Sequence, residues 1–279
     1  MYPSILPQIR EAIKRRYELI PYLYELSFRS AEEAQPLQRW TGWDVYAQDP
    51  SVWNNKLLRS GETQYFLGDA LLVGGVYEEN VNETEIYLPR CKDDAIYREK
   101  TREKYYDQGF ISLHFPYSYY SSGQWVTVPT PESNIAVLAR VGSVIPVGRP
   151  CVTTTQIEID SHLTKDTWRG VEIYPPPLAT RIEGCVYEGG WREDDGISLD
   201  SGVSEFHIRY KPEHDKIKLE ARCISKEFKV LWNFKIWVIL PVGEKRPVFA
   251  MDVKGIYVER ESSTDKNGRL GSSVSVITQ

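Results

Sequence analysis

The sequence QYFLGDALLV, residues 64–73, lies where the pattern of the chain changes from helical to strand-like. Gly68-Asp69 in its middle is a turn signal, and the apolar run after this turn predicts a strand over Leu71–Val76. Before residue 63 the apolar spacing is helical, whereas after it short strand patterns alternate with polar turns. The sequence therefore predicts a helical N-terminal segment followed by a β region.

The β region divides into two runs of strands around Gly148-Arg149-Pro150. The first run is completed by patterns at Thr84–Leu88, Phe110–Phe115, Gln124–Val128, Ile135–Ala139 and Ser143–Val147. The second run has patterns at Thr154–Ile159, Val171–Tyr174, Cys185–Tyr187, Glu205–Lys211, Lys216–Ala221, Lys235–Leu240, Pro247–Asp252 and Gly255–Glu259. Many short strands with polar turns are typical of β-sandwiches, so two are expected. The Ser-, Thr- and Gly-rich tail after Glu261 is expected to fray.

The N-terminal segment carries one strong helical pattern. Its apolar side chains form what we call the N-terminal stripe, namely Ile9, Ile13, Tyr17, Ile20 and Tyr24. Pro21 lies inside this pattern and should kink or interrupt the helix, because proline removes a backbone donor and crowds the preceding turn. No second long helix follows in the sequence. We therefore expect the N-terminal stripe to face a partner surface that this chain does not fully contain.

Composition argues against several classes of protein. Hydrophobic residues make up 41% of the chain, enough for packed cores, so bulk disorder is not expected. Lys and Arg number 34 against 39 Asp and Glu, a net charge of −5, and nucleic acid is therefore not an expected partner. No stretch approaches the ~20 apolar residues of a membrane span, and no signal peptide pattern opens the chain. A membrane is not an expected partner either, and the compartment is left open.

Two groups of residues suggest sites but have simpler explanations. Asp194-Asp195 could be a carboxylate pair or a calcium site. An Asx-type turn is simpler, because strand neighbours point to opposite faces and the spacing of a calcium loop is absent. The cluster Trp40, Trp43 and Trp53 could be a platform on which sugars stack. Large amphipathic rings also serve packing between domains, which is the interpretation we favour.

Other chemical motifs are missing from the sequence. The histidines are dispersed and lack metal-ligand spacing, at His114, His162, His207 and His214. The cysteines are expected to be unpaired buried thiols, with a disulfide left open for an exported protein, at Cys91, Cys151, Cys185 and Cys223. Neither a phosphate-binding loop nor a nucleophile elbow occurs. We therefore predict no catalytic residue, no cofactor and no metal site in this chain.

Seven short strings carry a family resemblance. They are RYELIPYLY (residues 16–24), PLQRW (36–40), QYFLGDALLV (64–73), EIYLP (85–89), YYD (105–107), LARVGSVIP (138–146) and EDDGIS (193–198). In this order they resemble the C-terminal part of glycoside hydrolase family 31, which contains α-glucosidases and α-xylosidases. The first two resemble the family's last barrel helix and the segment after it. The next four resemble its proximal sandwich, although Tyr105 stands where the family more often has Trp, and the last is typical of its distal domain.

The resemblance implies a mainly β fold, with two antiparallel β-sandwich domains preceded by the last helix and loop of a (β/α)₈ barrel. Residues 1–62 would be the C-terminal remnant of the catalytic barrel, residues 63–150 the proximal C-terminal β-sandwich and residues 151–279 the distal C-terminal β-sandwich. Family members are retaining glycosidases that use two aspartates on the barrel. Both lie upstream of the point that matches the start of this chain, and a full barrel needs about 250 residues.

The first functional hypothesis is the C-terminal part of a retaining family 31 enzyme, which hydrolyses α-O-glycosyl bonds in carbohydrate metabolism. The catalytic carboxylates would be missing from this chain, so the chain alone is expected to be inactive. One alternative is a free-standing, non-catalytic carbohydrate-binding β-sandwich module. Another is one chain of a two-chain glycosidase, completed by a barrel-bearing chain. Expected partners are an α-glycoside or oligosaccharide in the intact enzyme and a barrel-bearing chain. Sugar, linkage and oligomeric state are left open.

Overall fold

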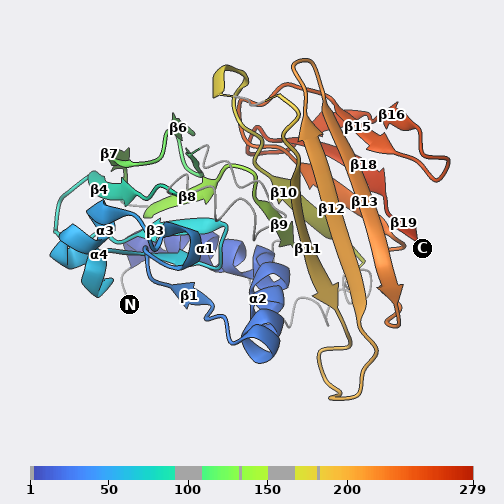
Figure 1. The fold of residues 1–279 in the computed structure, drawn as a ribbon, viewed down its shortest axis with the longest axis horizontal. Coiled ribbons are helices and arrows are strands. Elements are labelled where there is room, and N and C mark those ends of the chain that lie inside the picture. Colours follow the sequence, from blue (N-terminus) through green and yellow to red (C-terminus); the bar gives the residue numbers. More distant parts are fainter. Residues whose placement is uncertain (1–2, 92–108, 132–133, 150–166, 181–182, 279) are drawn as a thin grey trace. The chain divides into compact units, whose positions relative to one another are not determined.

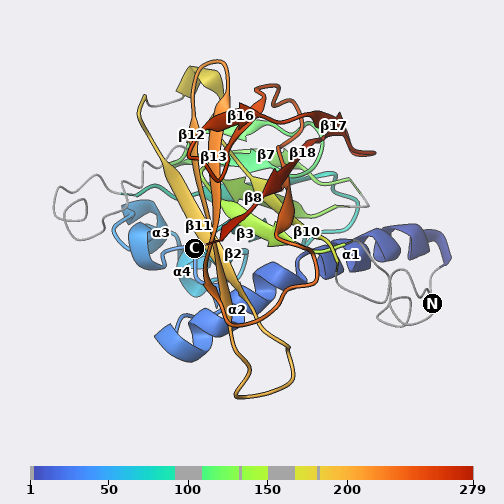
Figure 2. The same ribbon diagram turned by 90° about the vertical axis from the view of Figure 1, so that its right-hand side faces the viewer.

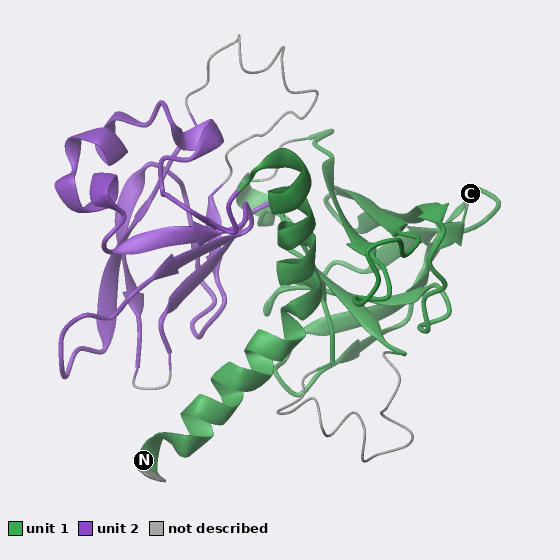
Figure 3. Cartoon of the chain, turned by 90° about the horizontal axis from the view of Figure 1, so that it is seen from below, with its two compact units in different colours: residues 1–35, 143–279 green, residues 36–142 purple. Residues whose placement is uncertain are grey.

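The computed structural model describes residues 3–91, 109–131, 134–149, 167–180 and 183–278. Contacts divide the chain into two compact units, which Figure 3 colours separately. Unit 1 contains residues 1–35 and 143–279, and unit 2 contains residues 36–142. The chain thus leaves unit 1 after the N-terminal helices and returns to it at residue 143.

Unit 2 is built from two antiparallel sheets (Figure 1). The larger has the order β1-β2-β3-β8-β5-β6, and the smaller pairs β4 with β7. The strands are β1 (Gln38–Arg39), β2 (Gln64–Leu67), β3 (Leu71–Gly74), β4 (Glu83–Leu88), β5 (Phe110–Ser112), β6 (Tyr119–Tyr120), β7 (Gln124–Pro129) and β8 (Ala136–Arg140). Between β1 and β2 lie η2 (Asp44–Tyr46), α3 (Pro50–Asn54) and α4 (Lys56–Ser60).

The core of unit 2 lies between these two sheets. Its buried side chains come from both of them and from η2, and include Tyr46, Phe66, Leu72, Ile86, Leu88, Phe110, Val126, Val128, Ala136 and Leu138. Tyr46 stacks on Phe66 with ring centroids 5.2 Å apart. Asn55 caps α4 by accepting hydrogen bonds from the backbone N–H groups of Leu57 and Leu58. Unit 2 is therefore a small β-sandwich with two short helices, as the pattern after residue 63 predicts for its strands.

Within the described residues, unit 1 contains one five-stranded and one six-stranded sheet. One has the order β17-β18-β14-β10-β9, and the other has the order β11-β12-β13-β15-β16 with β19 paired to β13. The strands are β9 (Val144–Val147), β10 (Arg169–Ile173), β11 (Tyr187–Glu193), β12 (Ser204–Pro212), β13 (Ile217–Lys226), β14 (Lys235–Ile239), β15 (Val248–Met251), β16 (Tyr257–Glu259), β17 (Ser262–Thr264), β18 (Leu270–Ser275) and β19 (Ile277–Thr278). Burial alternates along β12, as expected for a strand with one buried face. A helical turn, η3 (Leu178–Thr180), follows β10.

Three strand pairs of unit 1 differ from the antiparallel prediction. β10 pairs with β14, β13 with β15, and β13 with β19, all in parallel. Parallel neighbours need a crossover connection, and in each case the intervening chain forms other strands of unit 1. The mainly β fold class is confirmed, but the sheets of unit 1 are mixed because pairing direction depends on these long connections.

The expectation of a frayed tail after Glu261 is wrong. The β17–β18 hairpin, seen in Figure 2, pairs with β14 through β18. Ser272 and Val274 on β18 are both 1% exposed. The strand could not be predicted from the Ser- and Gly-rich sequence, because small residues can fill a buried face without an apolar pattern.

Two helices open unit 1, after the short turn η1 (Pro3–Ile5). They are α1 (Leu6–Glu18) and α2 (Ile20–Glu33), and Figure 3 shows the bend between them. The interruption falls at Leu19, with Pro21 in the first turn of α2, where its missing N–H costs no hydrogen bond. The predicted break at Pro21 is confirmed. None of the helices in the described part of the chain is long and apolar enough to cross a membrane.

The predicted strands of both runs correspond to β3–β5, β7–β10 and β12–β16 within the described residues, with ends shifted by a few positions. The strand predicted at Cys185–Tyr187 overlaps β11 only at Tyr187. The strand predicted at Thr154–Ile159 lies outside those residues, as does the predicted boundary at Pro150. The contact division at residues 35 and 142 follows the compact units of this structure. The predicted domain limits at residues 62 and 150 refer to the barrel and the two sandwiches of an intact enzyme, and they stay predictions.

Candidate functional site

The N-terminal stripe lies on the exposed surface of α1 and α2. Ile9, Ile13, Ile20 and Tyr24 remain 42, 38, 47 and 38% exposed, and Tyr17 is partly buried. All residues of α1 are described, and none of them is buried. A row of exposed apolar side chains of this length is a candidate interaction surface.

The opposite side of α2 is packed within unit 1. Tyr22 and Leu26 are 3% and 1% exposed, and α2 contacts β9 and β11. The buried carboxylate of Glu25 accepts hydrogen bonds from the backbone N–H and the guanidinium of Arg192, at 3.0–3.1 Å. Arg192 also lies over the ring of Phe28, 4.6 Å from its centroid. These contacts fix α2 and thereby hold the N-terminal stripe outward.

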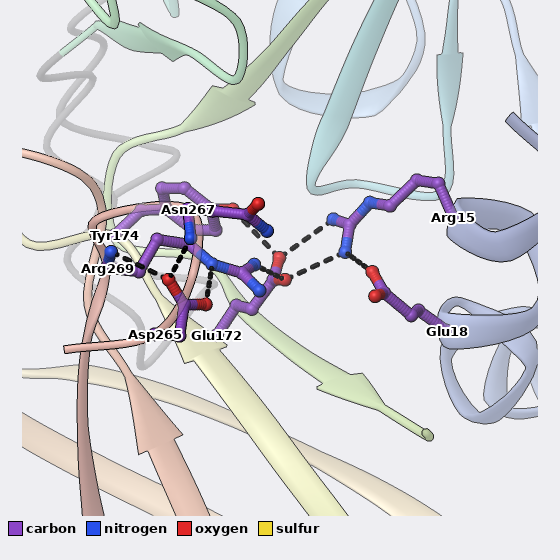
Figure 4. Close-up of polar contacts among 7 residues, drawn as sticks. All are labelled: Arg15, Glu18, Glu172, Tyr174, Asp265, Asn267 and Arg269. Carbon is purple, nitrogen blue, oxygen red and sulfur yellow. Dashed lines mark hydrogen bonds and ion pairs between the residues drawn. The ribbon is translucent and has the colours of Figure 1, made fainter. Parts of the chain in front are cut away.

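A second anchor joins α1 to the sheet through Glu172 on β10 (Figure 4). Arg15 Nη1 and Nη2 each donate to one Glu172 oxygen at 2.8 Å, and Arg269 Nη1 donates to Oε1 at 2.7 Å. Tyr174 donates its hydroxyl hydrogen to Oε2 at 2.9 Å. Arg15 also pairs with Glu18, and Arg269 with Asp265. Glu172 is 2% exposed, so four donors from three separate segments satisfy one buried carboxylate.

The electrostatics of this cluster favour a charged Glu172. Burial alone would raise the pKa of Glu172, but the adjacent Arg15 and Arg269 outweigh it and lower this pKa to about 2. Burial and the Glu172 charge raise the pKa of Tyr174 well above its usual range, so its hydroxyl stays protonated and donates. A general acid needs a pKa near the working pH, which Glu172 lacks. The cluster is therefore a structural anchor.

The Asp194-Asp195 pair forms the predicted turn. Asp194 Oδ1 accepts from the Gly196 N–H at 2.8 Å, and Asp195 Oδ1 accepts from the N–H groups of Ile197 and Ser198 at 2.9 and 2.8 Å. Asp194 also accepts the hydroxyl hydrogen of Tyr24 at 2.8 Å. Backbone hydrogen bonds lower the pKa of Asp195, which further separates it from a catalytic acid. The Asx-turn interpretation is confirmed.

The tryptophan cluster is largely engaged in packing within unit 2. Trp40 and Trp53 meet edge to face with centroids 4.8 Å apart. Trp40 donates its indole N–H to the Leu58 carbonyl at 2.5 Å, and Trp53 donates to the Ala47 carbonyl at 2.7 Å. Trp43 does not stack with either ring and is 38% exposed. These contacts favour packing over a sugar platform at this loop.

No metal-binding cluster of His, Cys, Asp or Glu occurs in the described part of the chain. His207 is half exposed and lies 3.9 Å from Glu205. Cys223 is a buried thiol whose pKa is raised by burial. His162 and Cys151 lie outside the described residues.

Sequence reasoning did not find the Glu172 cluster. One signal for it was present, since Glu172 interrupts the apolar strand pattern at Val171–Tyr174. A carboxylate in a buried strand requires a partner, which indicates an ion pair but not its donors. Arg15 and Arg269 come from segments far away in the sequence, so spacing alone could not identify them.

Part of the chain matches a known protein family. Residues 34–145 match the model described as the glycosyl hydrolase family 31 C-terminal domain. The chain carries a family 31 C-terminal domain. The matched range agrees with unit 2 (36–142) within a few residues at either end. The family resemblance is thus confirmed. Four of the seven strings lie within the matched range and residues 138–146 end one position beyond it, while residues 16–24 and 193–198 lie outside it.

Curated relatives extend the match beyond unit 2. Neutral alpha-glucosidase C from Mus musculus is 33% identical over 153 residues, which are 55% of this chain and 14% of the relative. The probable alpha/beta-glucosidase agdC from Aspergillus fumigatus is 25% identical over 269 residues, 95% of this chain and 26% of the relative. The chain therefore matches only 14% and 26% of the length of these two relatives.

Solved structures share the fold of nearly the whole chain. The Flavobacterium johnsoniae GH31 dextranase complexed with glucose has a TM-score of 0.70 and 18% identity, covering 98% of this chain and 32% of the dextranase. The Xanthomonas citri GH31 alpha-xylosidase has a TM-score of 0.56 and 18% identity, covering 95% and 24%. The fold of the chain therefore occurs as part of larger proteins of known structure.

Proposed function

We propose that this chain is the C-terminal part of a retaining family 31 glycosidase that hydrolyses α-O-glycosyl bonds. The family 31 domain over residues 34–145 supports the enzyme class. The names of relatives and neighbours, which include α-glucosidases, a dextranase and an α-xylosidase, support an α-glycoside or oligosaccharide as substrate of the intact enzyme. The role of this chain is to complete and support a catalytic barrel.

The N-terminal stripe is the observation that carries this role. α1 buries none of its residues, yet it is fixed in place by the Arg15–Glu172 pair. A helix that is anchored on one side and apolar on the exposed side is suited to pack against a further layer of structure. In the proposal that layer is the catalytic barrel, and residues 1–62 are its last helix and loop.

The catalytic carboxylates belong to that barrel in this proposal. A retaining mechanism needs two carboxyl groups about 5–5.5 Å apart across the sugar. Asp194-Asp195, the pair suggested by sequence, forms an exposed Asx turn instead. The barrel is supplied either by the same polypeptide or by a separate barrel-bearing chain, and the DNA sequence immediately upstream distinguishes these two cases.

An activity assay of the 279-residue chain tests the proposal. Alone, the chain should not turn over chromogenic α-glucosides or α-xylosides. Mixed with a family 31 barrel-bearing polypeptide, it should raise turnover, and the double variant Ile9→Lys/Ile13→Lys should raise it less. A matched control is Val253→Lys/Ile256→Lys, because these side chains lie between β15 and β16 and are 84% and 58% exposed.

Two results would overturn the proposal. One is turnover by the isolated chain that disappears when one of its own Asp or Glu residues is substituted. The other is a barrel-bearing polypeptide whose turnover is the same with and without this chain.

A further inference from the structure

A groove of about 240 Å³ lies on unit 1, beside the Glu172 cluster. Its floor is one face of the sheet β17-β18-β14-β10-β9. The strand register places Gly170 opposite Trp237 and Glu172 opposite Ile239 on that face. Its walls are Glu18, at the end of α1, and the β17–β18 hairpin with Asp265 and Asn267.

Two tryptophans line this groove, and glycines give their rings room. Trp168 lies across Gly170, where a Cβ atom would stand 2.6 Å from the ring. Trp237 lies beside Gly271, where a Cβ atom would stand 3.4 Å from the ring. Trp237 remains 36% exposed. Two indole rings therefore contribute to the lining of the groove.

Several hydrogen-bonding groups of the groove have no partner among the described residues. They are the indole N–H groups of Trp168 and Trp237, the side-chain amide of Asn267 and the hydroxyl of Ser263. Asn267 uses only its backbone N–H in the hairpin turn, where it donates to Asp265 at 2.8 Å. Donors and acceptors thus lie around an aromatic surface, as in sites that orient a small polar ligand.

The charges around the groove cancel one another. Three carboxylates and three cations occur there, namely Glu18, Glu172, Asp265, Arg15, Arg269 and Lys266. Five of these six are joined by the ion pairs of the Glu172 cluster. The groove consequently offers no surplus of positive charge for a phosphate or carboxylate ligand, and a neutral ligand fits it best.

We propose that this groove binds one ring of a neutral pyranose sugar. A pyranose has an apolar C–H face that stacks on an indole ring and a rim of hydroxyl groups that exchange hydrogen bonds. Trp237 supplies the stacking surface, and Asn267 and the indole N–H of Trp168 contact the hydroxyls. The volume is below the ~300–1,000 Å³ typical of pockets for larger ligands, which matches a single ring. The inference does not depend on the proposed function, since binding is measured without turnover.

Nuclear magnetic resonance of the indole N–H groups tests this site on the whole chain. Glucose, xylose, maltose and isomaltose are titrated to about 50 mM, because a ligand of one ring binds in the millimolar range. Glucuronate serves as a charged comparison. A saturable shift of the Trp237 indole signal is expected with at least one neutral sugar, and a weaker response with glucuronate.

Variants locate the binding. Trp237→Ala, read out at the Trp168 indole, and Asn267→Ala should each lower the affinity at least about tenfold. Asn267 is exposed, so its variant keeps the fold even where Trp237→Ala does not. Trp53→Ala is the matched control, since Trp53 is a tryptophan of unit 2 that is 47% exposed, against 36% for Trp237. It should leave the affinity unchanged.

Three outcomes overturn the proposal. The first is the absence of a saturable shift with all four neutral sugars. The second is an affinity that survives unchanged in Asn267→Ala and Trp237→Ala. The third is loss of binding in Trp53→Ala, which would place the sugar on the tryptophan cluster of unit 2.

Discussion

Arg15 and Glu172 form a two-pronged ion pair, in which both guanidinium Nη atoms donate to separate carboxylate oxygens at 2.8 Å. The two residues are 157 positions apart, so the pair joins the first helix to β10. A bidentate pair of an arginine and a carboxylate fixes the relative orientation of the two side chains and also stabilises their charges. The position of α1, and with it the direction of the N-terminal stripe, therefore depends on this contact.

Glu172→Gln should destabilise unit 1. The substitution keeps the shape of the side chain but removes the charge that Arg15 and Arg269 share, and breaking a buried pair costs about 3–5 kcal/mol. Urea denaturation of the purified chain measures the change in the free energy of unfolding. Glu188→Gln is the control, because Glu188 is 55% exposed and its pair with Arg209 lies at the surface. A loss no larger than that of the control would contradict the anchoring role.

Acidification should remove the contribution of Glu172. Its pKa is about 2 in the folded chain, below the ordinary value of 4.5 that it takes on unfolding. A lowered folded pKa gives stability that is complete above pH ~4.5 and is lost as the pH falls towards 2. The difference in unfolding free energy between the wild-type chain and Glu172→Gln should therefore shrink over this window. Other carboxylates titrate in both proteins and cancel in the difference. A difference that stays constant down to pH 2 would refute the assignment.

Local features of this fold were predictable from sequence, and non-local ones were not. The break near Pro21 and the Asp194-Asp195 turn depend on residues close together, where proline geometry and Asx hydrogen bonds decide the conformation. The strand pattern at Glu205–Lys211 corresponds to β12 because its alternation matches one buried face. Each of these follows from physics that acts over a few residues.

The missed features require residues brought together by folding. The Ser- and Gly-rich tail has no strand pattern that would indicate β18, because this strand is stabilised by pairing with β14. Parallel pairing of β10 with β14 depends on the path of the chain between them. Trp168 and Trp237 line one groove only because these two strands are neighbours. The spacing of residues in the sequence does not indicate which distant strands become neighbours in the sheet.

Glu25→Gln should loosen α2 from unit 1. Glu25 is 6% exposed and accepts hydrogen bonds from Arg29 and from the backbone and side chain of Arg192. Losing charge-assisted bonds at a site of this burial costs about 2–4 kcal/mol. Hydrogen exchange of the α2 amides should become faster, while the amides of unit 2 stay unchanged. Glu33→Gln is the control at the exposed end of the same helix. Equal exchange in the two variants would argue against this anchor.

Polar substitution of the N-terminal stripe should reduce self-association without reducing stability. Removing the helices with a chain that begins at residue 61 is a poor test, because it also removes the buried Tyr22 and Leu26 of α2 from unit 1. Ile9→Lys/Ile13→Lys changes side chains that are 42% and 38% exposed, so the unfolding free energy should change by less than about 0.5 kcal/mol.

Sedimentation velocity measures the association state of that double variant. Burying a side chain of this size is worth about 1.5–3 kcal/mol, so two adjacent ones on a surface without a partner favour contact between copies of the chain. The wild-type chain should therefore sediment as a mixture that shifts to larger species with concentration, and the double variant should shift less. Val253→Lys/Ile256→Lys is the matched control, because it adds the same charge at apolar positions of unit 1 that are 84% and 58% exposed, between β15 and β16. If the control suppresses association as strongly as the double variant, net charge is responsible. This outcome would contradict the interpretation of the N-terminal stripe as an interaction surface.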